Sequence, residues 1–310
     1  MIVDCHTRIW ESPGQLGLPT TGELNARRHR GGSLPPGADS WPDASPDVHL
    51  AACDPVDQTL VMSFKSRYLG VEIPTTLVAH YVRRHPDKLI GVAGVDPTNL
   101  AEALDDLHAA HDVHGMKAVT VSPASQDFHP ADSRAMQVFA EAAQLKMPVF
   151  VDQGVHFSAQ SKMEFGRPVL LDEVARELQQ LRIVVAHMGY PWVEECLVLM
   201  GKHRNVFADI SSLLHRPWQA YNAILAAYQY GVIDKLLFGS DFPFSRAVSA
   251  IESLYRINQL VTGTNLPTVP RTQLTAIVER DALALLGIPG AAAPRPIVDA
   301  EAELLETHDA

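Results

Sequence analysis

The strongest constraint on the fold is a repeated alternation, along 310 residues, of short apolar runs with amphipathic stretches. Each run is almost continuously apolar rather than alternating, which is typical of parallel strands covered on both faces. Eight runs qualify as candidate strands: 1–5, 59–62, 89–95, 116–121, 148–151, 183–186, 206–210 and 236–239. Eight such strands supply enough chain for a closed sheet.

The gaps between the runs carry apolar residues at helical spacing. In the stretch 133–146, Ala135, Met136 and Phe139 share one helical face, and Asp132 stands in the position of an N-cap. Helices are predicted at 73–84, 100–111, 133–146, 171–180, 193–203, 220–230, 248–260 and 272–286. Eight strand–helix repeats predict an α/β fold of the (β/α)8, or TIM-barrel, type. The alternative is a doubly wound open sheet, but no Gly-x-Gly-x-x-Gly follows the first strand.

The predicted domain is a single barrel over residues 1–289. A segment rich in Pro, Gly and polar residues, 12–47, follows the first strand as a long inserted loop. Barrels carry their active-site loops at this end of the strands, so the loop is either a substrate wall or a tolerated insertion. The segment 290–310 begins with Ala and Pro and then turns acidic, which predicts a flexible C-terminal tail.

Charge and cysteine content narrow the classes of partner. A net charge of −11 at pH 7 argues against nucleic-acid binding, which needs a basic face. No apolar run reaches the roughly 20 residues that span a bilayer, so no membrane partner is expected. Cys5, Cys53 and Cys196 show no paired spacing, and no leader precedes the first strand. We therefore expect reduced thiols and a cytoplasmic location.

Polar residues follow four of the predicted strands. The side chains at the carboxyl ends of barrel strands converge on one mouth, and residues two apart on a strand share a face. Any one His there is usually a hydrogen-bonded structural residue, and any one Asp is usually an N-cap. Five such residues at four strand ends together predict an active site: His6, Arg8, Asp152, His187 and Asp241.

These strand ends also carry a resemblance to a known family. Residues 1–10 (MIVDCHTRIW), 166–192 (ending AHMGYPW), 203–211 (HRNVFADIS) and 237–243 (LFGSDFP) resemble the amidohydrolase-2 family. This group of the amidohydrolase superfamily includes aminocarboxymuconate-semialdehyde decarboxylase-like proteins and several hydrolases. The resemblance implies a metal-dependent-hydrolase barrel with one divalent ion, usually zinc. It further implies ligands from a His-x-His on strand one, a His on strand five and an Asp on strand eight, with a strand-six His handling water.

The chain departs from that pattern at two positions. His6, His187 and Asp241 match, but Arg8 replaces the second histidine of His-x-His and Asp152 replaces the strand-five histidine. A guanidinium stays protonated and has no lone pair for a metal. Zn²⁺ or Mn²⁺ remains possible, since each of the other residue types is an acceptable ligand. A site that binds no metal, or binds it only weakly, and is held by an Arg–carboxylate pair is the favoured interpretation. The conditional metal ligands are His6, Asp152, His187 and Asp241.

The predicted activity is amidohydrolase-like hydrolysis of a small carboxylated cyclic or aromatic-derived substrate, of the lactone or ester type. Asp241 is the expected base, His187 a second proton handler, and Arg8 the group that binds a carboxylate or stabilises an oxyanion. Asp152 and Trp192 are the further substrate-binding candidates. The alternatives are a non-oxidative decarboxylase of the same family and a non-catalytic pseudoenzyme that binds a ligand or partner. The resemblance also makes a homodimer reasonable.

Overall fold

The structure, a computed structural model, describes residues 1–17, 41–154 and 160–290. Most of the loop predicted over 12–47 lies outside these residues. The tail predicted over 290–310 also lies outside them from residue 291 onward.

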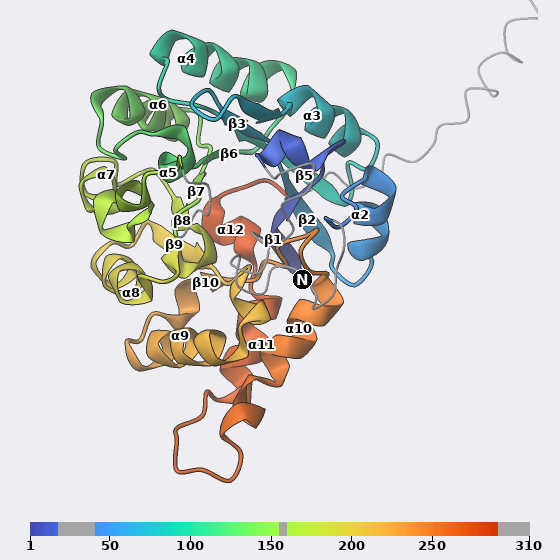
Figure 1. The fold of residues 1–310 in the computed structure, drawn as a ribbon, viewed down its shortest axis with the longest axis vertical. Helices are drawn as coiled ribbons and strands as arrows, with labels where there is room; N and C mark the ends of the chain where they lie inside the picture. Colours follow the sequence, from blue (N-terminus) through green and yellow to red (C-terminus); the bar gives the residue numbers. More distant parts are fainter. Residues whose placement is uncertain (18–40, 155–159, 291–310) are drawn as a thin grey trace, which may run out of the picture.

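Eight parallel strands form one sheet that closes on itself (Figure 1). In sheet order they are β1 (Val3–Arg8), β2 (Gln58–Met62), β5 (Leu89–Gly94), β6 (Ala118–Val121), β7 (Val149–Val151), β8 (Ile183–Val185), β9 (Val206–Asp209) and β10 (Leu236–Leu237). Closure comes from backbone bonds between the first and last strands. The Cys5 N–H donates to the Phe238 carbonyl at 2.9 Å, and the Arg8 N–H donates to the Phe242 carbonyl at 3.0 Å. The predicted TIM barrel is confirmed.

Most of the helices lie around the ring and cover its outer face, whereas the last one lies in the middle of the ring (Figure 1). In chain order the helices are α2 (Pro46–Ala52), α3 (Thr75–Arg83), α4 (Leu100–His108), α5 (Pro123–Gln126), α6 (Ser133–Gln144), α7 (Asp172–Glu177), α8 (Val193–Lys202), α9 (Pro217–Gln229), α10 (Ala247–Tyr255), α11 (Arg271–Glu279) and α12 (Ala282–Leu286). The predicted cap of α6 is present, since the Asp132 side chain accepts from the Arg134 N–H. Its apolar face buries Val138 and Phe139 against the barrel.

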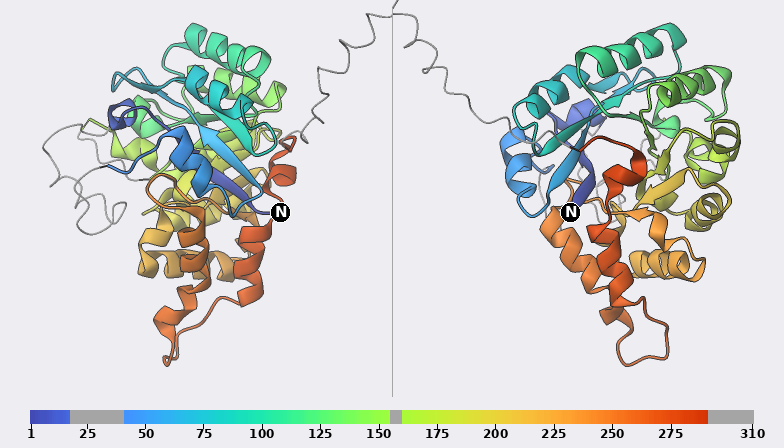
Figure 2. Two further views of the ribbon diagram at one scale, coloured as in Figure 1. Left: turned by 90° about the vertical axis from the view of Figure 1, so that its right-hand side faces the viewer. Right: turned by 180° about the vertical axis from the view of Figure 1, so that it is seen from behind.

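Two apolar layers hold the barrel. The larger one lies between the strands and the helices, and the smaller one fills the barrel interior. Side chains from strands all around the ring, such as Leu60 of β2, Phe150 of β7 and Leu237 of β10, meet in the interior. Helix α12 adds Leu283 and Leu286 to this layer and lies across the middle of the ring seen from behind (Figure 2). The amino-terminal end of the barrel is thus plugged, so ligands have access from the opposite end.

Several predicted boundaries are wrong. The helix predicted from residue 73 begins at Thr75, because Ile73 pairs with Phe64 in a short antiparallel hairpin of β3 (Phe64–Ser66) and β4 (Val71–Ile73). The helix predicted over 272–286 is two helices, α11 and α12. The chain breaks at Arg280, whose side chain donates to the carbonyls of Ile233 and Leu236.

Two further expectations concern membrane-spanning helices and the state of the cysteines. Over the described ranges, no helix has both the length and the apolar character needed to cross a bilayer. Cys5, Cys53 and Cys196 are all buried and free.

Candidate active site

The first strand extends further than its apolar run predicts, and this brings two site residues together. β1 continues through His6 and Arg8, with a register irregularity between Asp4 and Thr7. Two residues of β1, Cys5 and His6, there face the single residue Leu60 of β2, as in a β-bulge. Arg8 Nη1 lies 2.8 Å from His6 Nε2, so the two side chains occupy one face of the strand as predicted from their spacing.

A buried carboxylate holds His6 from the opposite side. His6 Nδ1 lies 3.1 Å from Oδ2 of Asp209, the last residue of β9, and both side chains are almost completely buried. Because an ionised carboxylate only accepts, Nδ1 carries the proton and Nε2 accepts from Arg8. Burial lowers the pKa of His6, the charge of Arg8 lowers it further, and Asp209 opposes both. His6 is therefore a neutral imidazole with a defined tautomer.

Both oxygens of Asp209 accept hydrogen bonds. Oδ1 accepts from the N–H of His187 at 3.0 Å, from the N–H of Ser211 at 3.1 Å and from the Ser211 hydroxyl. Burial alone would raise the pKa of Asp209, but the interactions with His6 and these bonds hold it well below its usual value. Asp209 is thus an ionised carboxylate surrounded by donors.

His187 has its tautomer fixed by the same group. It lies just after β8 with a positive φ of 56°. Its Nδ1 lies 2.8 Å from the Ser211 Oγ and 3.1 Å from the Ser211 carbonyl oxygen. The Ser211 hydroxyl already donates to Asp209, so Nδ1 of His187 is the donor and Nε2 keeps its lone pair. The His187 and His6 ring centroids lie 4.8 Å apart, and His187 Nε2 lies 3.6 Å from Asp152 Oδ1.

Asp152 and Arg8 form a charged pair across the mouth. Asp152 follows β7, and its Oδ2 lies 3.7 Å from Arg8 Nη2. The Arg8 side chain is only 6% exposed, and its Nε has no hydrogen-bond partner among the described residues. The guanidinium thus contacts His6 and Asp152 and keeps a buried N–H that a ligand oxygen can accept from.

Asp241 lies beside this group, at the last strand end. Asp241 is 5% exposed and has a φ of 66°, and its backbone N–H donates to the His6 carbonyl at 3.0 Å. This bond ties the loop after β10 to β1. Over residues 1–17, 41–154 and 160–290, the Asp241 carboxylate has no hydrogen-bond partner. Its oxygens are therefore not engaged by another described side chain.

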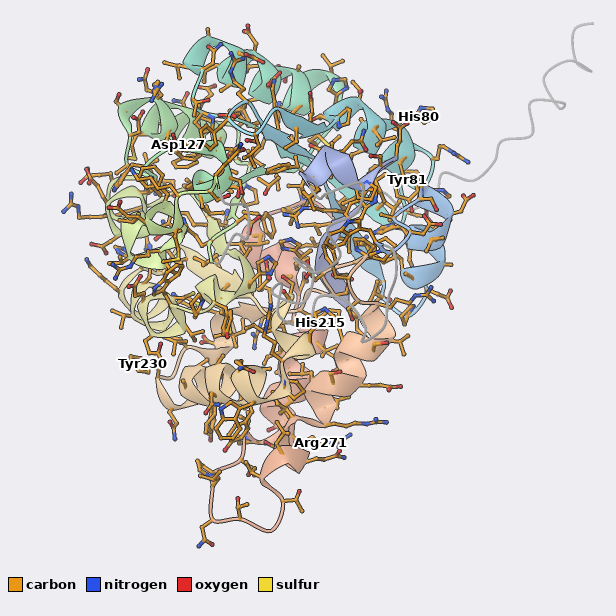
Figure 3. All side chains as sticks on the ribbon, viewed as in Figure 1. His80, Tyr81, Asp127, His215, Tyr230 and Arg271 are labelled. Carbon is orange, nitrogen blue, oxygen red and sulfur yellow. The ribbon has the colours of Figure 1, made fainter. Side chains whose placement is uncertain are left out.

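Sequence reasoning missed residues after β9. His215 and Arg216 both have their pKa lowered by burial, and the charge of Asp241 opposes that shift in each. The Arg216 Cζ lies 5.2 Å from the centroid of the Tyr190 ring. In Figure 3, His215 lies toward the middle of the ring, whereas Tyr230 and Arg271 lie at the periphery. A second cationic side chain therefore stands within electrostatic reach of Asp241.

Asp209 was missed because the run that contains it was interpreted only as a strand, and not as a strand end that carries a site residue. Asp209 falls inside the predicted run 206–210, and only the structure shows that its side chain reaches His6. Trp192 directly precedes α8 and is partly exposed; its backbone N–H donates to the Gly189 carbonyl, and its carbonyl accepts from the Cys196 N–H. Its role in substrate binding stays a prediction.

The donor atoms of His6, His187 and Asp209 lie within 4.8 Å of one another, close enough to suggest a metal cluster. Most of these atoms already take part in hydrogen bonds, although His187 Nε2 keeps its lone pair. Both Asp209 oxygens accept hydrogen bonds, both Nδ1 atoms donate, and His6 Nε2 accepts from Arg8. This group differs from the predicted ligand set, and it does not fit a divalent ion while the guanidinium keeps its position.

Solved structures share the fold at low sequence identity. An uncharacterized TIM-barrel protein of Bordetella bronchiseptica has 22% identity and a TM-score of 0.68, over 92% of this chain and 99% of that one. A probable 2-pyrone-4,6-dicarboxylic acid hydrolase of Acinetobacter baumannii, with citric acid bound, has 15% identity and a TM-score of 0.59, over 93% and 99%. The 5-carboxyvanillate decarboxylase of Novosphingobium aromaticivorans, complexed with manganese and a nitrobenzoic acid, has 12% identity and a TM-score of 0.62, over 93% and 96%.

No curated protein matches the chain by sequence. The family model described as amidohydrolase matches residues 3–288, which includes every strand of the barrel and each predicted site residue. The chain belongs to the amidohydrolase family.

Proposed function

We propose that the protein hydrolyses a lactone, or a comparably activated ester, of a small carboxylated ring compound at a site without a bound metal ion. The observation that carries the proposal is the 2.8 Å contact between Arg8 Nη1 and His6 Nε2. The lone pair that would bind an ion is used by the guanidinium. The fixed positive charge there also repels a dication.

The proposed class of substrate follows from the hydrogen-bond donor of Arg8 that has no partner among the described residues. Arg8 keeps an unpartnered, buried Nε–H in the described structure, and an N–H of a guanidinium pairs best with a carboxylate or a developing oxyanion. The solved relative that carries citric acid is a probable pyrone-dicarboxylic acid hydrolase, which supports a carboxylated ring as substrate. A lactone suits a site without a Lewis acid because its leaving group is already good.

In the proposed reaction, water opens the lactone ring with the help of Asp241 and Arg8. Asp241 takes a proton from water, and the water oxygen bonds to the lactone carbonyl carbon. The carbonyl oxygen becomes an oxyanion, which Arg8 stabilises. The ring C–O bond then breaks, and the leaving oxygen receives the proton that Asp241 took from water, which returns Asp241 to its ionised form. The product is the ring-opened hydroxy acid.

The test is a screen of carboxylated lactones with chelator-treated protein. We expect turnover without metal and a loss of at least about 100-fold in kcat for Asp241→Asn, the usual effect of removing a general base. Asp172→Asn is the matched control. Asp172 is a carboxylate remote from the site that pairs with Lys202 at 2.6 Å, so this variant retains full activity.

Three results would overturn the proposal. Undiminished lactone hydrolysis by Asp241→Asn removes the assigned base. Release of CO2 from an aromatic carboxylate, with no lactone opened, makes the protein a decarboxylase instead. A protein that binds carboxylated rings but turns none over is the pseudoenzyme alternative.

A further inference from the structure

Asp209 is the most enclosed charge of the site. Its side chain is 0% exposed, and it lies behind the two histidines as seen from Arg8. Four donors converge on its two oxygens: Nδ1 of His6, the N–H of His187, and the N–H and hydroxyl of Ser211. A carboxylate in this position contacts no ligand directly, so its effect on the site runs through its partners.

The first partner is His6. Asp209 Oδ2 accepts the hydrogen bond that the protonated Nδ1 of His6 donates, and this leaves the Nε2 lone pair directed at Arg8 Nη1, 2.8 Å away. The reverse tautomer would set an N–H of His6 against an N–H of Arg8, which is two donors facing each other. The buried guanidinium can therefore stay next to His6 only while Asp209 accepts from the other side of the ring.

The second partner is His187. Its backbone N–H is held by Asp209 Oδ1, and its Nδ1 lies 2.8 Å from the Ser211 hydroxyl that the same oxygen orients. His187 thus also presents a bare Nε2 to the mouth. One carboxylate sets both imidazoles with Nδ1 protonated.

We propose that Asp209 is a positioning residue that fixes the tautomers of His6 and His187 and, through His6, holds the Arg8 guanidinium in the site. The inference rests on the proposed function for its kinetic consequence only. The hydrogen-bond pattern it predicts can be measured without any substrate.

Asparagine is the informative substitution because it keeps the shape of the side chain. An amide has one accepting oxygen and one donating NH2. If the oxygen faces the donors of His187 and Ser211, the NH2 faces His6 Nδ1. That nitrogen must then accept, the proton moves to Nε2, and Arg8 loses its acceptor. We expect Asp209→Asn to convert His6 to the Nε2–H tautomer.

The experiment uses the full chain labelled with ¹⁵N-histidine and long-range ¹H–¹⁵N correlation spectra, with the His6 signals assigned by their loss in His6→Gln. Wild type is expected to show His6 as the Nδ1–H tautomer, and Asp209→Asn as the Nε2–H tautomer. In kinetics, kcat/KM falls by about 10- to 100-fold, the usual range for a group acting through a directly involved side chain.

The matched control is Asp172→Asn. Asp172 Oδ1 lies 2.7 Å from His203 Nε2, so this variant removes a different Asp–His pair and changes the His203 signals alone. A His6 tautomer unchanged in a folded Asp209→Asn protein overturns the proposal. Should that variant not fold, the wild-type spectrum still decides, since Nε2–H at His6 contradicts it. Absence of lactone turnover would refute the proposed function and leave this result standing.

Discussion

Replacing Arg8 by methionine keeps a long unbranched side chain and removes the guanidinium. His6 is 1% exposed, so its Nε2 would become a buried acceptor without a donor, which costs about 1–3 kcal/mol. Asp152 would lose its counter-ion at 3.7 Å, but it is 17% exposed and water can replace part of the interaction, so we add about 1 kcal/mol. The free energy of unfolding should fall by about 2–4 kcal/mol.

The assay is urea unfolding of Arg8→Met beside Arg167→Met. Arg167 also pairs with a carboxylate, that of Glu195, but its side chain is 47% exposed, so its removal should leave the unfolding free energy nearly unchanged. Lactone hydrolysis by Arg8→Met should fall by about 10²–10³-fold in kcat, as for loss of one oxyanion donor. If Arg8→Met is as stable and as active as the control, the guanidinium is not part of the site and the reasoning fails.

Two further predictions concern the same strand. Arg8→His restores a His-x-His with His6, so zinc affinity measured by calorimetry should rise steeply above wild type; equal affinity in both would contradict the role given to Arg8. Asp4→Asn should remove a pH dependence of stability. Burial raises the pKa of Asp4 from 3.8 to about 6, so the folded state holds this proton more tightly than the unfolded state. The resulting stability, about 3 kcal/mol, is fully present below about pH 4 and is lost as the pH rises through 6. Urea unfolding between these values should show the slope in wild type only, and equal slopes would contradict the assignment.

The barrel could be predicted from the sequence because its signal is local. Each strand is an apolar run and each helix an amphipathic stretch, so element type follows from composition over a few residues. The ends of strands and helices were harder to predict where contacts between distant parts of the chain decide them. β1 continues into His6 and Arg8 because their polar side chains find partners at the barrel mouth, and Ile73 joins a hairpin because Phe64 is there to pair with.

Part of the candidate site could be predicted from the sequence, but Asp209 and the hydrogen bonds that join the site residues could not. The strand-end rule places His6, Arg8 and Asp152 at one mouth, and the structure has them in contact. That rule cannot state which nitrogen of a histidine faces which neighbour. This depends on Asp209, which is 203 residues from His6 in the chain and meets it only when the barrel closes.

We infer that the Arg8 guanidinium occupies the position from which a metal ion would be bound in this barrel. The most direct test is the metal content, by elemental analysis, of active protein purified from medium supplemented with zinc and manganese and then passed over a desalting column. The account predicts far less than one equivalent of either metal, with lactone hydrolysis intact. One tightly held zinc or manganese ion per chain, lost together with activity on chelation, would contradict it.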